Sequence, residues 1–210
     1  MKTQKLSKLI ILAFITAFFS ITTKAQTVEI TPSYGYQFGS KIDYGRNYIK
    51  LQESDQWGVT IGVDGFKGIV TEVSYFHQST AITASGPNIE NSHIADLNAD
   101  WILVGASKIL PVDNEQLRPF VGGGLGMAIF NTSNTPSTIG SIDTEFYFAV
   151  SLKAGINYMF NEKIGLNLQG NLMFPIQWGG VYIGTGGGGV SGSSTTLVGG
   201  FSGGLVYRLN

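Results

Sequence analysis

The feature that most constrains this chain is a two-residue alternation of apolar and polar side chains. In residues 164–174 (IGLNLQGNLMF), leucine and phenylalanine fall on even positions, whereas Asn167, Gln169 and Asn171 fall on odd ones. Successive side chains of a β-strand point to opposite faces, so the pattern predicts a strand with one apolar and one amide-lined face. Seven other segments alternate similarly, and no apolar period of 3.6 residues persists. The eight predicted strands are 27–38, 56–65, 68–79, 95–109, 118–130, 144–160, 164–175 and 195–209.

The connections between these segments alternate in length. The links after the second, fourth and sixth segments are short, as in the GFKG turn at 65–68. The other links are long, and the longest is the glycine-rich stretch at 176–195. An even number of strands with short turns at one end and long loops at the other is typical of an outer-membrane barrel. The sequence therefore predicts an all-β fold: an eight-stranded antiparallel up-and-down transmembrane barrel with long extracellular loops and short periplasmic turns.

Composition indicates which face of the predicted barrel points outward. Charged residues make up 13% of the chain, and glycine supplies 29 of its 210 residues, against typical shares of roughly 25% and 7%. An eight-stranded barrel has little interior space, so the many large apolar side chains are predicted to face lipid and the glycine-rich polar face to line the lumen. On the fourth strand this assignment places Leu97, Trp101, Leu103 and Ile109 outward and Asp96, Asp100 and Lys108 inward.

A charge buried in the lumen is costly unless it has a partner. The inward charges are therefore expected to form a network, whose members are Glu29, Glu72, Asp100, Lys108, Arg118, Lys153 and Arg208. Glu29 lies near the start of the first strand and Arg208 near the end of the last, so closure of the barrel should bring them together. Lys153 should find Glu72 or Asp100 across the lumen. Such a network would plug the barrel, and a narrow channel for small solutes is the alternative.

Residues 1–25 have the features of a secretory signal peptide: a basic start, a short apolar run and small residues before Gln26. Cleavage between Ala25 and Gln26 would leave a barrel domain at 26–210. Nine of the 13 basic residues would remain against 14 acidic ones, a net charge of −5, which excludes a nucleic-acid-binding footprint. The chain has no cysteine, so it carries neither disulfides nor a lipobox anchor. The predicted location is the outer membrane of a Gram-negative-type bacterium.

Three segments resemble the small eight-stranded outer-membrane β-barrels of the OmpA-like and OmpX-like family. They are PFVGGGLGMAIF at 119–130, SLKAGINYMFNEKIGLNLQGNLMF at 151–174 and GFSGGLVYRL at 200–209. The favoured function is a non-enzymatic one, structural or in surface interactions, in which a monomer in outer-membrane lipid presents its loops to an extracellular partner. The resemblance also implies insertion by the barrel-assembly machinery, which reads a terminal aromatic residue. Here Tyr207 is followed by Arg208, Leu209 and Asn210, which departs from that signal.

An enzymatic alternative rests on His77 and Ser79, which share the predicted outward face of the third strand. Outer-membrane lipid A deacylases resemble this barrel and use a lipid-facing His-x-Ser with a nearby Glu. The imidazole of His77 could accept the Ser79 hydroxyl proton while Glu90 orients the ring. Ordinary rim residues are the competing interpretation, because His-x-Ser occurs often by chance. A secreted, soluble ligand-binding barrel is a further alternative.

No cofactor or metal is expected. The two histidines, His77 and His93, are scattered, and without cysteine they make no metal site. The glycine-rich run GTGGGGVSG at 184–192 lacks the Lys-Ser/Thr of a phosphate-binding loop.

Overall fold

The computed structural model of the protein describes seven ranges of the chain. They are 27–44, 47–86, 89–134, 144–176, 181–184, 187–190 and 197–209. Only the backbone is described over 41–44, 47–49, 85–86, 89–92, 181–184 and 187–190. The predicted signal peptide at 1–25 and its cleavage site lie outside the described residues.

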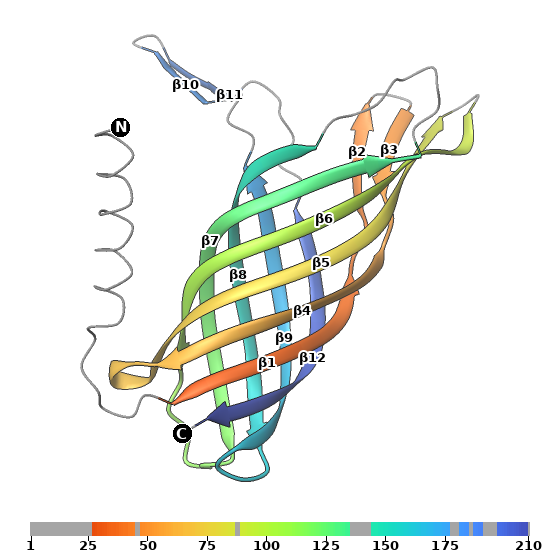
Figure 1. Ribbon diagram of the computed structural model, residues 1–210. Coiled ribbons are helices and arrows are strands. Elements are labelled where there is room, and N and C mark those ends of the chain that lie inside the picture. The colour runs from red at the N-terminus through yellow and green to blue at the C-terminus, as the bar shows by residue number, and fades with distance from the viewer. Residues whose placement is uncertain are drawn as a thin grey trace, which may run out of the picture.

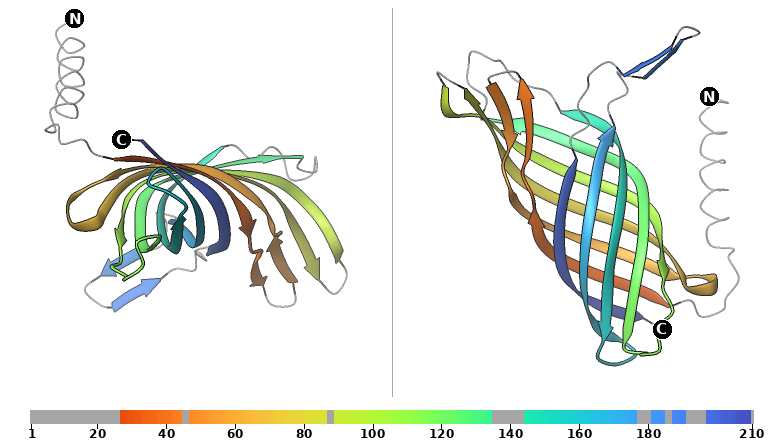
Figure 2. Two further views of the ribbon diagram at one scale, coloured as in Figure 1. Left: turned by 90° about the horizontal axis from the view of Figure 1, so that it is seen from below. Right: turned by 180° about the vertical axis from the view of Figure 1, so that it is seen from behind.

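Eight long strands form a closed antiparallel barrel, which confirms the predicted fold class (Figure 1). They are β1 (Val28–Gln37), β4 (Ser54–Asp64), β5 (Ile69–Gly86), β6 (Ile89–Ile109), β7 (Leu117–Ser133), β8 (Glu145–Met159), β9 (Ile164–Ile176) and β12 (Val198–Leu209). Each strand pairs with the next barrel strand along the chain, and β12 pairs with β1 to close the ring. The strands cross the barrel at a tilt, as Figure 2 shows from behind for β7, β8, β9 and β12. None of the described residues forms a helix long and apolar enough to cross a membrane.

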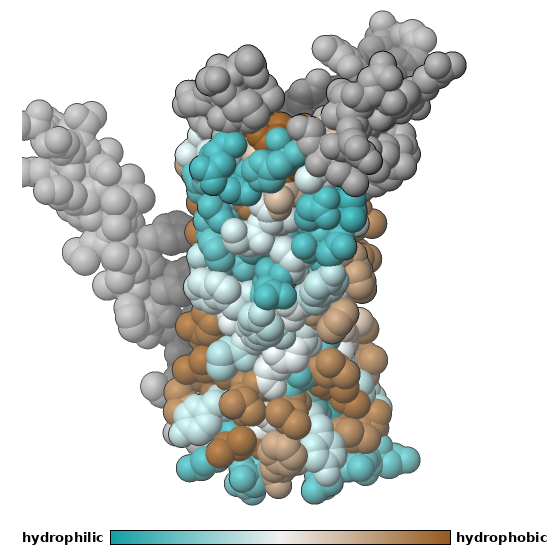
Figure 3. All heavy atoms as spheres, turned by 90° about the vertical axis from the view of Figure 1, so that its right-hand side faces the viewer, coloured by the Kyte–Doolittle hydropathy of each residue, from teal (hydrophilic) through white to brown (hydrophobic). Residues whose placement is uncertain are grey.

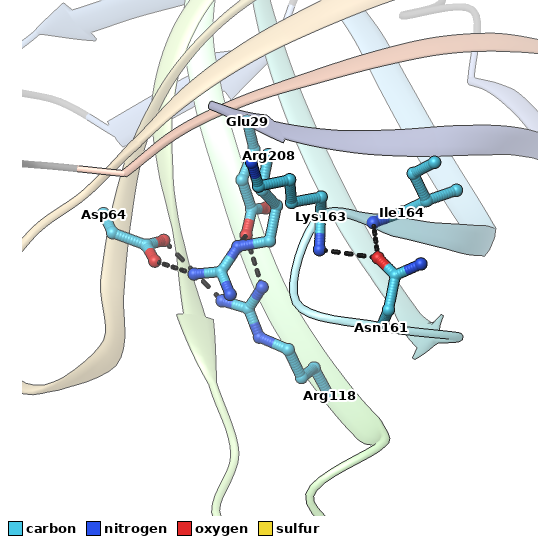
Figure 4. Close-up of polar contacts among 7 residues, drawn as sticks. All are labelled: Glu29, Asp64, Arg118, Asn161, Lys163, Ile164 and Arg208. Atoms are coloured by element: carbon cyan, nitrogen blue, oxygen red, sulfur yellow. Dashed lines mark hydrogen bonds and ion pairs between the residues drawn. The ribbon is translucent and has the colours of Figure 1, made fainter. Parts of the chain in front are cut away.

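The short connections lie at one end of the barrel, which we call the turn end. The β4–β5 connection is a single 3₁₀ turn, η1 (Phe66–Gly68), in which Lys67 and Gly68 both have positive φ. Glycine adopts this left-handed conformation without the steric cost that other residues meet. In the β8–β9 turn, Asn161 Oδ1 accepts hydrogen bonds from the backbone N–H groups of Lys163 and Ile164 at 2.8 and 2.9 Å (Figure 4).

The opposite end, which we call the loop end, contains strands that the sequence analysis assigned to loops. They are β2 (Ser40–Tyr44), β3 (Asn47–Leu51), β10 (Val181–Gly184) and β11 (Gly187–Val190). β5 and β6 continue pairing as far as Gly86 and Ile89, and β3 pairs with β5. Strands β2, β3, β5 and β6 thus form a four-stranded extension of the barrel wall (Figure 1). These segments were predicted as loops because each is only four or five residues long, too short to show a persistent alternation.

Side chains alternate between the lumen and the outer surface. On β9 Leu166 and Leu168 are exposed on the outside, whereas Asn167, Gln169 and Asn171 are buried inside. In the space-filling view of Figure 3, hydrophobic residues cover much of the half toward the turn end, and hydrophilic residues gather toward the loop end. On the face shown, an apolar region therefore lies between a hydrophilic rim at the turn end and the more hydrophilic loop end.

The face assignment of β6 was wrong. Leu97, Trp101, Leu103 and Ile109 point inward, and Asp96, Asp100 and Lys108 point outward. Residues directly opposite each other in an antiparallel pair share a face, and Trp101 lies opposite the buried Phe76 while Asp100 lies opposite the outward His77. The prediction failed because β6 has large apolar side chains at both odd and even positions, so its own pattern does not determine which face is turned to lipid.

Candidate functional site

Two acids and two arginines fill the turn end of the lumen (Figure 4). Arg208 Nε lies 2.9 Å from Glu29 Oε1, and Arg208 Nη2 lies 2.5 Å from Asp64 Oδ2. Arg118 contacts the same Glu29 carboxylate, and its Nη2 lies 3.6 Å from Asp64 Oδ1. Glu29 and Arg208 are direct partners in the β1–β12 register, as barrel closure required. Asp64 is a member that the sequence analysis missed, although its even position shares the inward parity of β4.

A second ion pair crosses the lumen farther from the turn end. Lys153 of β8 contacts the carboxylate of Glu72 on β5, and these strands are not neighbours in the barrel. Both side chains are largely buried, with 13% and 11% of their surfaces exposed. Lys153 Nζ also lies 5.7 Å from the centre of the Phe120 ring. Glu72 is one of the two acids expected for Lys153.

The other expected acid, Asp100, does not belong to the lumenal network, and neither does Lys108. Both point outward, where β6 brings Asp100 toward the loop end and Lys108 to the turn end. Lys108 Nζ contacts the backbone carbonyl oxygen of Lys67 in the η1 turn. Charges near the ends of a barrel strand reach water, so they cost less than charges at mid-depth.

Amide side chains occupy the lumen on both sides of the Lys153–Glu72 pair. Toward the turn end, Asn167 Nδ2 donates to Asn157 Oδ1 at 2.7 Å. Toward the loop end, Gln37 Nε2 donates to Gln56 Oε1 at 2.7 Å and to Asn171 Oδ1 at 3.2 Å, and Asn171 donates to the same Gln56 oxygen. We call the last three residues the amide layer. Charged and amide side chains therefore occupy the lumen from the turn end up to this layer, and two cavities of about 20 and 30 Å³ remain between them.

The outer face carries a polar cluster where β4, β5 and β6 run side by side. His77 Nδ1 lies 2.8 Å from Asp100 Oδ1, and the Tyr75 hydroxyl donates to the same oxygen at 2.7 Å. The Trp57 ring centre lies 5.4 Å from that of His77. Ser79 is exposed on this face two residues beyond His77, a separation of about 6.8 Å along a strand. Among the described contacts, no hydrogen bond joins Ser79 to His77.

The acid that orients His77 is Asp100 rather than the predicted Glu90. The backbone of Glu90 lies ten residues further along β6, at the far end of the extension, which is roughly 30 Å away along an extended strand. The side chain of Glu90 lies outside the described part of the structure. This contact does not follow from the sequence pattern, because the predicted orientation of β6 places Asp100 in the lumen.

His93 forms a separate pair at the loop end. Its Nε2 lies 2.8 Å from Asp96 Oδ1, and Asn134 Nδ2 donates to the other Asp96 oxygen at 2.5 Å. Within the described ranges, no group of three or more His, Asp or Glu side chains is arranged to hold a metal ion. Part of the glycine-rich run at 184–192 lies outside the described residues.

Comparison with known proteins identifies the fold. No protein-family model and no curated protein sequence matches the chain. Among solved structures, Neisserial surface protein A matches with a TM-score of 0.60 and 11% identity over 87% of this chain and 97% of its own. This chain has the fold of a small eight-stranded outer-membrane β-barrel. OprG from Pseudomonas aeruginosa matches with a TM-score of 0.60 and 14% identity over 89% of this chain and 97% of its own.

A third small outer-membrane barrel is also similar. Ail, the attachment invasion locus protein of Yersinia pestis, solved with the heparin analogue sucrose octasulfate, matches with a TM-score of 0.54. The identity is 14% over 88% of this chain and 99% of that protein. In outer-membrane barrels of this fold the apolar band faces lipid, the short turns face the periplasm and the longer loops face the outside. The likeness at these identities concerns the fold.

Proposed function

We propose that this protein is a non-enzymatic, non-conducting barrel of the bacterial outer membrane that acts at the cell surface through its loop end. The filled lumen carries this proposal. From Glu29 to the amide layer, ion pairs cross the lumen from β7 to β1 and from β8 to β5, and amide hydrogen bonds join the neighbouring strands β8–β9 and β1–β4. An eight-stranded barrel has an interior just wide enough for its own side chains. The two cavities left in this part of the lumen, about 20 and 30 Å³, are large enough for only one or two water molecules each, so no open route for a solute passes through it.

The loop-end extension supports a role in surface interactions. Strands β2, β3, β5 and β6 continue the sheet beyond the barrel, and β2 is its edge strand, with no further partner among the described strands. A free edge strand offers a row of backbone N–H and C=O groups to which an extended peptide can add as a further strand. The partner class that this surface suits is a protein with an extended segment.

Display at the surface can be tested by labelling, because the natural chain has no cysteine. Ser85→Cys places a thiol on the extension, and Asn114→Cys is the matched change in the β6–β7 connection at the turn end. We expect a membrane-impermeant maleimide to label Ser85→Cys in intact cells and Asn114→Cys only after permeabilisation. Labelling of the turn-end variant in intact cells would reverse the proposed orientation, and labelling of neither variant in the outer-membrane fraction would argue against display.

The filled lumen predicts that the protein does not conduct. Wild-type protein, refolded and shown to migrate faster on an unheated gel than after heating, is added to a planar bilayer. We expect no discrete conductance steps, because a permeating ion would have to displace Lys153 from Glu72 and open the turn-end cluster. Reproducible steps would instead support the narrow solute channel.

A second candidate function is hydrolysis of a lipid ester at the outer surface, and the His77–Asp100 pair favours it. If the Nδ1–H of His77 donates to Asp100, its Nε2 is left to accept the Ser79 hydroxyl proton. Ser79 Oγ would then attack the ester carbonyl, the acyl group would transfer to Ser79, and the alcohol would leave with the proton from His77. Water would release the fatty acid in a second step. Nucleophile–base contacts in an unliganded site are often longer than in the reacting complex.

This candidate is tested by mass spectrometry of lipid A from cells that produce the wild type, Ser79→Ala, His77→Ala or the control His93→Ala. If the protein is a hydrolase, lipid A should lack one acyl chain in wild-type and His93→Ala cells. It should be intact in Ser79→Ala and His77→Ala cells. Identical lipid A in wild-type and Ser79→Ala cells would exclude the candidate and leave the non-enzymatic proposal standing.

A further inference from the structure

Two lysines lie close together on the outside of the barrel at the turn end, and we call them the lysine pair. Lys67 belongs to the η1 turn, which projects outward from the barrel wall in Figures 1 and 2. Its ammonium group lies 5.1 Å from the centre of the exposed Phe66 ring. Lys108 belongs to the end of β6, and its Nζ contacts the backbone carbonyl oxygen of Lys67. This contact places the Lys108 ammonium group at the turn that carries the Lys67 side chain.

The lysine pair has no acidic partner among the described residues. Asp64, at the end of β4, points into the lumen and pairs there with Arg208. No ion pair joins either lysine to Asp113 or Glu115, the acids of the β6–β7 connection. Four other basic side chains of the described ranges do pair with carboxylates; they are Lys50, Arg118, Lys153 and Arg208. Two neighbouring positive charges at the turn end are therefore left for an anion from outside the described chain.

The outer wall beside the lysine pair is apolar. Lys108 lies between its strand partners Ile69 and Val121, and both of these side chains are exposed. The next charged or ionisable group on the outer face of β6 is Asp100, roughly 20 Å deeper along the barrel axis at a strand tilt of about 40°. The outward residues in between on β5 and β6 are Thr71, Val73, Tyr75, Ile102, Val104 and Ala106. The lysine pair therefore lies at the turn-end border of an apolar band, where the headgroups of membrane lipids are found.

We propose that the lysine pair binds the phosphate group of one anionic phospholipid of the phosphatidylglycerol type, whose acyl chains lie along the apolar outer wall of β5 and β6. Lysine binds phosphate as a compact point charge, and each basic residue near a membrane surface adds to its attraction for anionic lipid. A headgroup with net negative charge is favoured, because no described carboxylate lies at the pair to bind a choline or ethanolamine cation. The inference rests on the membrane placement in the proposed function and is independent of the role of the loop end.

Native mass spectrometry of the refolded protein in detergent micelles tests the proposal by counting bound lipids. Phosphatidylglycerol is titrated, and phosphatidylcholine with the same acyl chains is the neutral comparison. We expect the first phosphatidylglycerol to bind about thirtyfold more tightly, the combined contribution of two lysines near an anionic headgroup. Glycerol 3-phosphate, which has the phosphate but no acyl chains, should not bind at the same concentrations. Equal affinity for the two lipids, or binding of glycerol 3-phosphate as tight as that of the lipid, would overturn the proposal.

A matched variant locates the site. Lys163 is another exposed turn-end lysine, but it lies in the β8–β9 turn, and β7 separates β8 from β6 (Figure 4). We expect Lys67→Gln and Lys108→Gln each to weaken phosphatidylglycerol binding about fivefold, and Lys163→Gln to bind as the wild type does. An equal loss in Lys163→Gln would indicate a general effect of charge and would overturn the site. Affinities in micelles do not depend on orientation in the cell, so a reversed orientation in the maleimide experiment would leave this result unchanged.

Discussion

Replacing Lys153 by methionine is expected to lower the free energy of unfolding of the barrel by about 3–5 kcal/mol, the usual cost of removing one partner of a buried ion pair. Methionine keeps most of the length of the side chain but removes the charge. The carboxylate of Glu72, only 11% exposed, would then be left without its cation. The favourable position of the ammonium group near the Phe120 ring would be lost as well. Urea unfolding of the refolded barrel in lipid vesicles measures the change.

A second substitution separates loss of the pair from loss of packing. Adding Glu72→Gln to Lys153→Met removes the unpaired charge and should recover part of the lost stability. Asp100→Asn in the same background is the matched control, because Asp100 lies on the outer face with His77 and should recover nothing. Equal recovery by both second changes would contradict the lumenal geometry of this pair.

Most of the fold could be predicted from the sequence because a strand of a membrane barrel alternates between apolar side chains that face lipid and polar or small side chains that face the lumen. On β9 the outward leucines and inward amides identify the strand and its orientation without any knowledge of its neighbours. The same holds for β12, where glycine, serine and valine on even positions face the lumen and Phe201, Leu205 and Tyr207 face outward. The resemblance to small outer-membrane barrels rested on such segments, and the comparisons confirm it for the fold.

β6 shows where single-strand patterns fail. Trp101 and Leu103 at odd positions compete with Ile102 and Val104 at even ones, so neither face is distinctly apolar. Which face of β6 points inward is decided by its pairing register with β5, and this register cannot be read from the pattern of one strand. A shift of the register by one residue would exchange the two faces of the strand. This error removed Asp100 from the outer face and hid its contact with His77.

The pairings within the lumen were only partly predictable for the same reason. Glu29 and Arg208 could be paired because closure of the barrel makes β1 and β12 neighbours. Lys153 reaches across the barrel to Glu72, and the choice between candidate acids depended on which strands point charges inward. To predict that the indole N–H of Trp101 lacks a hydrogen-bond partner among the described residues, one would need both the correct face of β6 and the positions of all neighbouring acceptors.

Leu168→Arg is expected to destabilise the barrel by about 2–4 kcal/mol if Leu168 lies near the middle of the bilayer. Leu168 is 60% exposed on the outer face of β9, where its strand partners are Ile156 and Gly203. An arginine there would have no acidic partner among the residues opposite it and would have to reach water along the barrel wall. The loss is measured by urea unfolding in lipid vesicles of defined chain length, with the wild type as reference.

The depth of the substitution, rather than the charge itself, should set the size of the loss. Leu209→Arg makes the same change on the outer face at the turn end, opposite Val28, where the expected cost falls to about 0–1 kcal/mol. Asn167→Leu, the lumenal neighbour of Leu168, removes the hydrogen bond to Asn157 and should cost about 1 kcal/mol. The two arginine variants carry identical charge, so the medium around each site is expected to set most of the difference between them. If Leu168→Arg were as mild as Leu209→Arg, the apolar face of β9 would not lie in lipid, and a soluble barrel would have to replace the membrane one.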